Sequence, residues 1–429
     1  MTARRTPGND EGQTPVPQVT PMLPVAVIGA GAAGLMAAIH AAGTGCRVVL
    51  LERTRDGGRK ILISGGGRCN VLPSQLDPAR FVSESPPHLV RRVLAGWPLA
   101  RQRAFFEEVL GLPLALEAES GKLFPVSNRA RDVRDRLVAG ARDAGAELRF
   151  GTAVTGVERS AAGWGVMFED QAPLEAGAVI VATGGLSVPA TGSDGMGLSI
   201  ARRLGHTIRE TYPALTPLVA DPPVHAHLSG LSLEVRIEAR VGGKRFRSEG
   251  GFLFTHRGYS GPSVLDLSHL AVRSRLTGGE RQVLRVAWSR ESAEVWNARL
   301  QRRSPRTVQS TLREVIPARL VEQLLGESQV RAGCQLAQLS RDDRRRIVEL
   351  LSAYPLPWTG DEGYRKAEVT GGGVALEEID PVTLQSRLCP GIHFCGEVLD
   401  AFGPIGGHNF AWAWATGRAA GLGVSVSAR

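Results

Sequence analysis

VAVIGAGAAGLMAAIHAAG, residues 25–43, decides the fold of this chain. Its first five residues are apolar and rich in β-branched side chains, which predicts a short, buried parallel strand. Gly29, Gly31 and Gly34 follow with the spacing G-x-G-x-x-G, and the residues after them favour a helix. In such a unit the first glycine makes the tight turn, the second lets the backbone approach a pyrophosphate, and the third lets the helix pack closely on the strand.

An acidic residue stands where a dinucleotide-binding unit needs one. The second predicted strand, RVVLLE at residues 47–52, ends on Glu52, 18 residues after Gly34. We expect the Glu52 carboxylate to accept hydrogen bonds from a ribose, while the helix N-terminus faces the phosphates. Strand, helix and acid in register therefore indicate a dinucleotide-binding domain rather than a glycine-rich turn without a ligand.

A second glycine-rich stretch, GGRKILISGGGRCN at residues 57–70, follows soon after Glu52. Its five glycines disfavour a regular helix or strand. The stretch leaves the carboxyl end of the second strand, where the ligands of open α/β sheets bind. Its bare backbone and its positive charges suit a flat or anionic ligand. An ordinary NAD domain has no need of such a loop there, so the expected dinucleotide is FAD.

Length, charge and cysteine content limit the class of protein. A chain of 429 residues is long enough for two or three domains. The 51 Lys and Arg against 42 Asp and Glu give a net charge of +9, which permits a nucleic-acid partner but also describes an Arg-rich, solvated surface. The five cysteines form no C-x-x-C pair, so we expect a cytoplasmic protein without a metal site. The apolar run at 25–43 has Rossmann glycine spacing, so we expect no membrane span.

The chain resembles the flavoproteins of the glutathione-reductase structural class and, within them, the YhiN/BaiN-type family of FAD-binding oxidoreductases, which also carries the label aminoacetone oxidase family. The matching stretches follow in order from residue 25 to residue 421. They are VIGAGAAGLMAA, GRKILISGGGRCN, GKLFPVSNRARDV, VIVATGG, FLFTHRGYSGP, KAEVTGGGV and GEVLDAFGPIGGHNFAWAWATG.

The expected fold class is α/β: a Rossmann-like FAD-binding domain with a parallel sheet, interrupted by an inserted β-rich subdomain and a small helical subdomain. Alternating apolar and polar residues in LEVRIEARV, KRFRSEGGFLF and RQVLRVAW predict the antiparallel strands of the insert. The predicted boundaries are a disordered tail at 1–21, the FAD-binding domain at 22–197 and 359–429, the β-rich subdomain at 198–290 and the helical subdomain at 291–358.

The resemblance also implies which residues contact FAD. The first glycines would hold the pyrophosphate, and the acid after them would hold the ribose. The ribityl chain and the isoalloxazine would contact loops from both ends of the polypeptide. The implied residues are Gly29, Gly31, Ala32, Ala33, Gly34, Glu52, Arg53, Arg59, Lys60, Ser64, Gly65, Gly66, Gly67, Arg68, Cys69, Asn70, Val154, Thr183, Gly184, Gly185, Gly396, Glu397, Gly406, Gly407, His408, Asn409 and Phe410.

The motifs leave the catalytic residues undefined. Arg68, Cys69, His256 and His408 are weak candidates. Cys69 stands alone in its loop, so we do not expect a redox-active cysteine pair. His408 departs from the Tyr expected there in relatives, so no stacking role is assigned to it. The polar residues of FTHRGYSGP at 254–262 are candidate flavin-facing substrate contacts.

The expected activity is that of an FAD-dependent oxidoreductase, with three alternatives for its substrate. The first is NAD(P)H-driven reduction of an activated C=C bond in a small molecule, and the second is reduction of uridine in ribosomal RNA to dihydrouridine. The third is oxidation of an amine or aminoketone. A flavin- or RNA-binding module without catalysis is the alternative outside enzymes. Because no second strand–G-x-G-x-x-G–helix unit is present, NAD(P)H is expected only as a transient electron donor.

Overall fold

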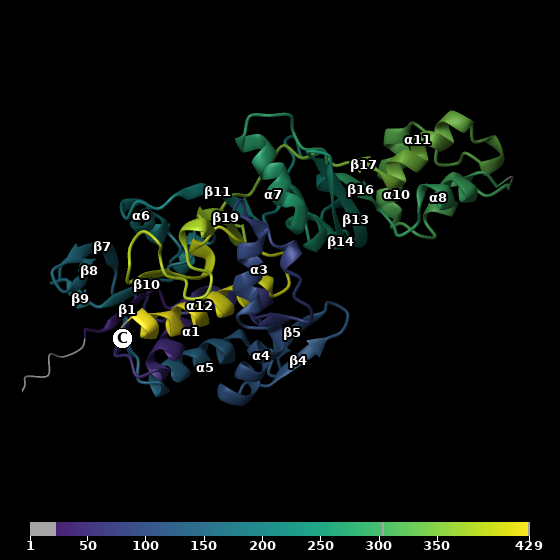
Figure 1. Cartoon of the computed structure of the whole chain (residues 1–429). Helices are drawn as coiled ribbons and strands as arrows, with labels where there is room; N and C mark the ends of the chain where they lie inside the picture. The colour runs from purple at the N-terminus through teal and green to yellow at the C-terminus, as the bar shows by residue number, and fades with distance from the viewer. Residues whose placement is uncertain (1–22, 303, 428–429) are drawn as a thin grey trace, which may run out of the picture.

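The computed structural model describes residues 23–302 and 304–427 (Figure 1). The tail predicted to be disordered, 1–21, lies outside the described residues. The centre of the larger lobe is a parallel sheet whose inner strands are buried runs composed mainly of Val, Ile, Leu and Ala. Its strand order is β20 (Ile392–Phe394), β10 (Ala178–Val181), β1 (Val25–Ile28), β2 (Val48–Glu52) and β6 (Glu147–Phe150). The predicted α/β class with a parallel sheet is therefore confirmed.

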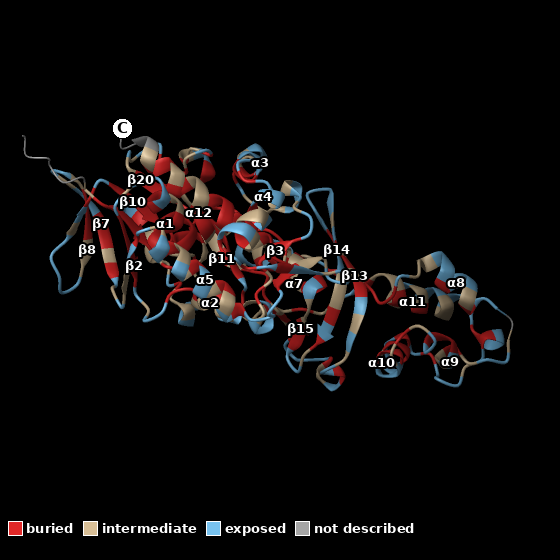
Figure 2. Ribbon diagram, turned by 90° about the horizontal axis from the view of Figure 1, so that it is seen from below, coloured by how far each residue is buried: buried red, intermediate tan, exposed pale blue. Residues whose placement is uncertain are grey.

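Two helices from opposite ends of the sequence pack on each other beside this sheet, α1 (Ala32–Gly43) and α12 (His408–Ser427). Their close approach depends on small residues. A Cβ atom at Gly417 would lie 2.3 Å from the Ala33 carbonyl oxygen, and one at Gly421 would lie 2.4 Å from the Ala37 carbonyl oxygen. Figure 2 shows the buried residues concentrated around this helix pair and the sheet. The C-terminal segment thus completes the domain that the N-terminal segment begins.

Smaller elements surround the parallel sheet. Helices α5 (Ala130–Asp143) and α6 (Met196–Arg203) follow the sequence pattern, whereas α3 (Pro87–Ala95) and α4 (Leu99–Ala104) were not predicted. The remaining strands of this lobe form two small antiparallel sheets. One contains β7 (Val154–Ser160), β8 (Gly163–Phe168) and β9 (Leu174–Ala176), and the other β3 (Leu72–Pro73), β5 (Lys122–Pro125) and β4 (Leu114–Glu117).

The chain enters and leaves the insert through an antiparallel strand pair, β11 (Ile208–Ala214) and β19 (Val369–Val374). The segment KAEVTGGGV, one of the stretches that carry the family resemblance, therefore contains β19, which pairs with β11 and does not join the parallel sheet. The insert itself is a seven-stranded antiparallel sheet, as predicted. Its order is β17 (Tyr354–Pro355), β16 (Arg285–Ala287), β13 (Ser232–Val241), β14 (Lys244–Phe254), β15 (Gly258–Ser260), β12 (Leu218–Val219) and β18 (Gly360–Asp361).

A helical subdomain follows the insert sheet at the end of the molecule farthest from the parallel sheet (Figure 1). Its helices are α8 (Ala293–Leu300), α9 (Val308–Leu312), α10 (Ala318–Ser328) and α11 (Arg341–Ser352). One helix of the insert was not predicted: α7 (Pro262–Leu276) begins directly after FTHRGYSGP and packs on β14. Its apolar positions are interrupted by Ser, Asp, His and Arg, which obscured the helical pattern.

The close contact in the turn between β1 and α1 predicts that a substitution of Gly34 lowers the stability of the protein. A Cβ atom at Gly34 would lie 1.8 Å from the Gly29 carbonyl oxygen, so Gly34→Ala forces helix and strand apart. We expect this change to lower the free energy of unfolding by about 3 kcal/mol, at the upper end of overpacking effects. Denaturant unfolding of the purified variant measures it.

Gly43→Ala is the matched control, because a Cβ atom at Gly43, in the same helix, meets nothing within 4 Å. We expect Gly43→Ala to be neutral or slightly stabilising. Equal stability of the two variants would contradict the close helix–strand contact.

Candidate functional site

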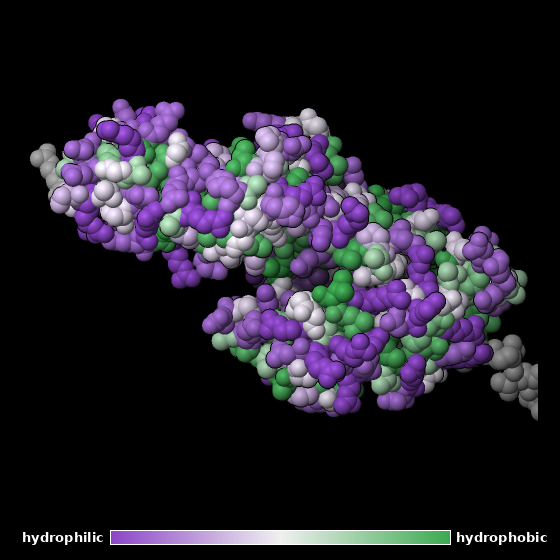
Figure 3. Space-filling view, turned by 180° about the vertical axis from the view of Figure 1, so that it is seen from behind, coloured by the Kyte–Doolittle hydropathy of each residue, from purple (hydrophilic) through white to green (hydrophobic). Residues whose placement is uncertain are grey.

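A cavity of about 580 Å³ opens at the carboxyl ends of the parallel strands. Its volume lies within the roughly 300–1,000 Å³ of ordinary ligand sites. The walls come from the β1–α1 turn, the ends of β2 and β10, the glycine loop after β2, and residues 396–413. Figure 3 shows the molecular surface hollowed between the two lobes, with apolar side chains gathered around the hollow. The cavity thus lies where open α/β sheets bind their ligands.

The β1–α1 turn presents free backbone donors to this cavity. Gly29 has a φ of +101°, a conformation that favours glycine. Gly31 is the N-cap of α1, and no side chain caps the helix and no acid occupies its first turn. A Cβ atom at Gly31 would meet nothing within 4 Å, so the space in front of the helix N-terminus is open. Helix amide groups without a side-chain cap form a binding site for an anion such as a pyrophosphate.

Glu52 lies at the end of β2, where the sequence places it. Its carboxylate accepts hydrogen bonds from the backbone N–H groups of Ala30 (2.8 Å) and Thr54 (2.7 Å). These bonds fix the carboxylate at the cavity wall, and a carboxylate has further lone pairs for two hydroxyl donors. Val154, the first residue of β7, lines the same end of the cavity. This end therefore suits a nucleoside.

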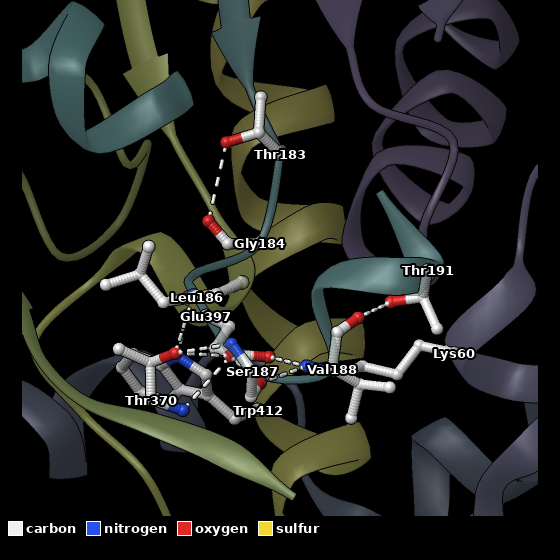
Figure 4. Close-up of polar contacts among 11 residues, drawn as sticks. Lys60, Thr183, Gly184, Leu186, Ser187, Val188, Thr191, Thr370, Glu397 and Trp412 are labelled. Atoms are coloured by element: carbon white, nitrogen blue, oxygen red, sulfur yellow. Dashed lines mark hydrogen bonds and ion pairs between the residues drawn. The ribbon is translucent and has the colours of Figure 1, made fainter. Parts of the chain in front are cut away.

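A carboxylate from the C-terminal part of the chain is held at the middle of the cavity (Figure 4). Glu397 Oε2 accepts a hydrogen bond from the Lys60 ammonium at 2.6 Å. Its Oε1 accepts from the Thr370 backbone N–H at 3.0 Å and from the Thr370 hydroxyl at 2.9 Å. The Ser187 hydroxyl also donates to Oε1. One carboxylate thus joins four chain segments that are far apart in the sequence.

The glycine-rich stretch after β2 is more regular than the sequence predicts. RKILI forms the short helix α2 (Arg59–Ile63), and a 3₁₀ turn follows at Ser64–Gly67, in which Gly65 and Gly66 are left-handed. The short helix forms because all five glycines lie outside RKILI. Arg59, Lys60 and the turn up to Gly66 line the cavity, as does Asn70.

Arg68 and Cys69, predicted to contact FAD and weak catalytic candidates, lie outside the cavity lining. The Arg68 guanidinium pairs with Glu117 at 2.9 Å and lies over the Phe124 ring, 4.0 Å from its centroid. Cys69 is fully buried, and burial raises the pKa of its thiol to about 12. A thiol with that pKa is neither a nucleophile nor a proton donor near neutral pH. Neither side chain lines the cavity, so both catalytic assignments stay predictions that the cavity geometry does not support.

The two histidine candidates also lie away from the cavity. His256 is exposed in the turn between β14 and β15, and its neighbour Tyr259 points into the insert core, where its hydroxyl is 2.9 Å from His225 Nδ1. FTHRGYSGP therefore supplies no wall of the cavity. His408 is buried with Nδ1 3.2 Å from the Ile405 carbonyl oxygen, and burial, with a contribution from Arg80, lowers its pKa to about 4. His408 is therefore neutral near pH 7, and it is not among the residues that line the cavity.

Most residues predicted to contact FAD line the cavity: Gly29, Gly31, Ala32, Ala33, Glu52, Arg53, Arg59, Lys60, Ser64, Gly65, Gly66, Asn70, Val154, Thr183, Gly184, Gly396, Glu397, Gly406, Gly407, Asn409 and Phe410. Besides Arg68, Cys69 and His408, the residues outside the lining are Gly34, Gly67 and Gly185. Gly34 contacts Gly29, and a Cβ atom at Gly185 would lie 2.4 Å from the Thr370 hydroxyl oxygen, so these two glycines serve close packing.

Sequence reasoning missed the charged residues at the end of the cavity opposite Glu52. Lys122 begins β5, and Glu368 directly precedes β19. Both stand in stretches that carry the family resemblance, GKLFPVSN and KAEVTGGG, where a charged side chain adjoins an apolar strand. Phe402 and Ile405 supply apolar surface beside them. Within residues 23–302 and 304–427, no group of three His, Cys, Asp or Glu is arranged to hold a metal ion.

Comparison with known proteins gives a consistent result over nearly the whole chain. The profile of the HI0933-like protein Rossmann domain matches residues 23–423. A ribosomal RNA dihydrouridine synthase of Escherichia coli is 33% identical over 91% of this chain and 95% of its own length. A 3-dehydro-bile acid delta(4,6)-reductase of Clostridium scindens is 31% identical over 92% of this chain and 98% of its own length. A second ribosomal RNA dihydrouridine synthase, from Haemophilus influenzae, is 33% identical over 93% of this chain and 98% of its own length.

Solved structures share the fold at low sequence identity. The 3-ketosteroid-delta4-(5alpha)-dehydrogenase of Rhodococcus jostii aligns with a TM-score of 0.51 and 15% identity, covering 96% of this chain and 98% of that one. Sdh1 of Mycobacterium smegmatis aligns with a TM-score of 0.50 and 18% identity, covering 95% of this chain and 68% of that one. The parallel sheet with its antiparallel insert is thus a fold that this chain shares with these proteins. The described part of the chain contains no helix long and apolar enough to cross a bilayer.

The contacts of Glu397 predict a loss of stability when its carboxylate is removed. Glu397→Ala leaves the Lys60 ammonium, the Ser187 hydroxyl and the Thr370 N–H without their acceptor. We expect the free energy of unfolding to fall by about 2 kcal/mol, because buried donors without an acceptor keep their desolvation cost. Urea unfolding followed by circular dichroism measures this change.

Glu322→Ala is the matched control, because Glu322 pairs with Arg313 on the exposed surface of the helical subdomain. We expect a change of at most about 0.5 kcal/mol for it. A Glu397→Ala protein as stable as this control would show that the four segments do not depend on the carboxylate.

Proposed function

Because the chain belongs to the HI0933-like family of FAD-dependent Rossmann proteins, we propose that it is an FAD-dependent reductase of activated C=C bonds whose substrate is uridine in ribosomal RNA. Both relatives named dihydrouridine synthase match over nearly their full length, as does the relative named a delta(4,6)-reductase. A dihydrouridine is a uridine whose ring C=C bond has been saturated. These names favour reduction over the oxidation of an amine or aminoketone and over a module without catalysis.

One observation carries the proposal: a single cavity runs from Glu52 to Phe410 past the uncapped N-terminus of α1. This arrangement fits FAD. The Gly29–Gly31 turn would hold the pyrophosphate, and Glu52 would hold the adenosine ribose. Lys60 and Glu397 would lie beside the ribityl–phosphate portion. The far end, at Ser64, Gly65, Gly66 and Asn70 and around Gly406, would hold the isoalloxazine.

When bound, FAD supplies hydride transfer between a nicotinamide donor and an acceptor. The protein's own contribution at this end includes the helix α12, which begins directly after the left-handed residues Gly406 and Gly407. Its N-terminus carries partial positive charge and stabilises negative charge that develops beside it. We propose NADH or NADPH as a donor that visits this face transiently.

Charge supports RNA as the substrate. The chain carries a net charge of +9, and Arg59, Lys60 and Lys122 line the cavity. A uracil ring would have to leave the RNA stack to reach the isoalloxazine end, as bases do in enzymes that modify them. An rRNA substrate would also place the protein in the cytoplasm.

A small enone is the second candidate substrate. The isoalloxazine end of the cavity is walled in part by Val369, Ala401, Phe402 and Ile405. Apolar walls of this kind suit a hydrocarbon ring system, and one relative is named for a bile acid substrate. Salt-sensitive binding would favour RNA over such a molecule.

Nucleoside analysis of ribosomal RNA tests the proposal. We expect rRNA from a strain lacking this gene to have lost dihydrouridine, and the purified protein with NADPH or NADH to restore it in that rRNA. Mass spectrometry of the digested nucleosides measures both. A Gly43→Ala protein, expected to fold normally, is the positive control for complementation. Unchanged dihydrouridine in the deletion strain would contradict the RNA substrate, while reduction of an enone by the purified protein would then support the second candidate.

A further inference from the structure

We infer that Glu368 is the acid that protonates the substrate carbon during reduction, and that Lys122 is a positioning residue that tunes this carboxyl group. The inference rests on the proposed function, since it assigns a role at the same cavity. Reduction of a C=C bond needs a proton as well as a hydride, and none of the residues predicted to be catalytic from the sequence lines the cavity.

Glu368 lines the cavity at the end proposed for the isoalloxazine. It lies between the insert and the flavin domain, directly before β19, and its backbone N–H donates to the Leu215 carbonyl oxygen at 3.2 Å. Val369, Phe402 and Ile405 line the same end. Lys122 reaches this end from β5, because its Cε atom lies 3.4 Å from where a Cβ atom would stand at Gly406.

The other carboxylates of the cavity are committed to structural contacts or lie elsewhere. Glu52 accepts two backbone hydrogen bonds, Glu397 accepts the Lys60, Ser187 and Thr370 donors, and Asp194 pairs with Arg53. Glu169 follows β8 at the nucleoside end. The Glu368 side chain has no hydrogen bond or ion pair at contact distance among residues 23–302 and 304–427, so its proton is available to a ligand.

Desolvation, and not the sum of the neighbouring charges, keeps the proton of Glu368 on at higher pH than usual. The Glu368 side chain is exposed, but to the cavity that it lines, and the protein around the carboxyl raises its pKa. Lys122 and Lys60 oppose this rise, and the Asp266 carboxylate on α7 adds to it. Asp266 is itself held at this end, because it accepts a hydrogen bond from the Ile405 N–H at 2.9 Å. A general acid works best when its pKa lies near the working pH.

No thiol or imidazole competes for this role in the cavity. Cys69 and His408 lie outside the lining, and His256 is exposed on the insert. Glu368 is therefore the uncommitted carboxyl group at the end where the substrate would meet the isoalloxazine.

The proposed step balances in atoms and electrons. One carbon of the C=C bond would gain a hydride, the chemistry that FAD would supply when bound, with NAD(P)H as the source of its two electrons. The other carbon gains a proton from the Glu368 carboxyl group, and the C=C π bond is lost. The resulting Glu368 carboxylate regains a proton from water, so the net reaction consumes one NAD(P)H and one proton.

Separate half-reactions of the holoenzyme test this role. We expect Glu368→Gln to bind FAD with unchanged affinity, measured by flavin fluorescence on titrating the apoprotein, and to be reduced by NADPH or NADH at the wild-type rate. After anaerobic reduction by dithionite, its reoxidation by dihydrouridine-free rRNA or by 2-cyclohexenone should be at least about 100-fold slower than for wild type, the usual size of general acid catalysis. Glu362→Gln, six residues earlier on the same segment and outside the cavity lining, should behave as wild type.

The outcomes separate the two proposals. Reoxidation of Glu368→Gln at the wild-type rate would overturn the role of Glu368 and leave the proposed function standing. A reduced wild-type protein that neither acceptor reoxidises would overturn the proposed function and this inference with it.

The pH profile of Lys122→Met gives a second test. A merely structural role of Lys122 would not shift this profile. Removal of the ammonium favours the protonated form of Glu368, so the pKa of this carboxyl rises further. A reaction that needs the protonated acid slows as the pH rises through that pKa, so the alkaline limb of the rate profile should move to higher pH. An unmoved alkaline limb, with the FAD content unchanged, would contradict the inference.

Discussion

The carboxylate of Glu397 is the constraint on which the arrangement of the site depends. A carboxylate away from bulk water is stable only when its oxygen atoms are satisfied, and here the partners come from α2, from the loop after β10 and from β19. Lys60 and Glu397 are 337 residues apart in the sequence, on either side of the insert. Their pairing closes the flavin domain around the cavity, although the chain leaves that domain between the two.

The insert is also part of the site, because it brings charge to one end of the cavity. Asp266 on α7 holds the loop at Ile405, and Glu368 stands where the chain returns from the insert. The opposite end is built by the N-terminal Rossmann unit, through Gly31 and Glu52, together with Val154 at the start of β7. Under the proposed function, this end would hold the nucleotide, and the chemistry would take place at the end to which the insert contributes.

Sequence reasoning predicted the Rossmann unit well because each of its signals is local. The spacing of Gly29, Gly31 and Gly34 and the position of Glu52 follow from strand and helix periods alone. The sequence could not place the catalytic candidates relative to the cavity, because exposure and side-chain direction depend on tertiary packing, and none of the four lines it. Cys69 adjoins the glycines of the cavity wall, yet its side chain is buried on the other side. Lys122 and Glu368 were missed because they are 246 residues apart in the sequence and line one cavity only in the folded chain.

The central claim is that this cavity holds FAD, and flavin binding by a Gly31 variant tests it most directly. A Cβ atom at Gly31 meets nothing within 4 Å, so Gly31→Val should fold as well as wild type while filling the space in front of the α1 N-terminus. The account predicts one FAD per chain for the wild-type protein after denaturation and quantification of the released flavin. It predicts little or none for Gly31→Val, with a Tm equal to that of the wild-type apoprotein, because bound FAD itself would raise the Tm of the wild type. A wild-type protein that neither contains FAD nor binds added FAD, or a stable Gly31→Val protein with full FAD content, would contradict it.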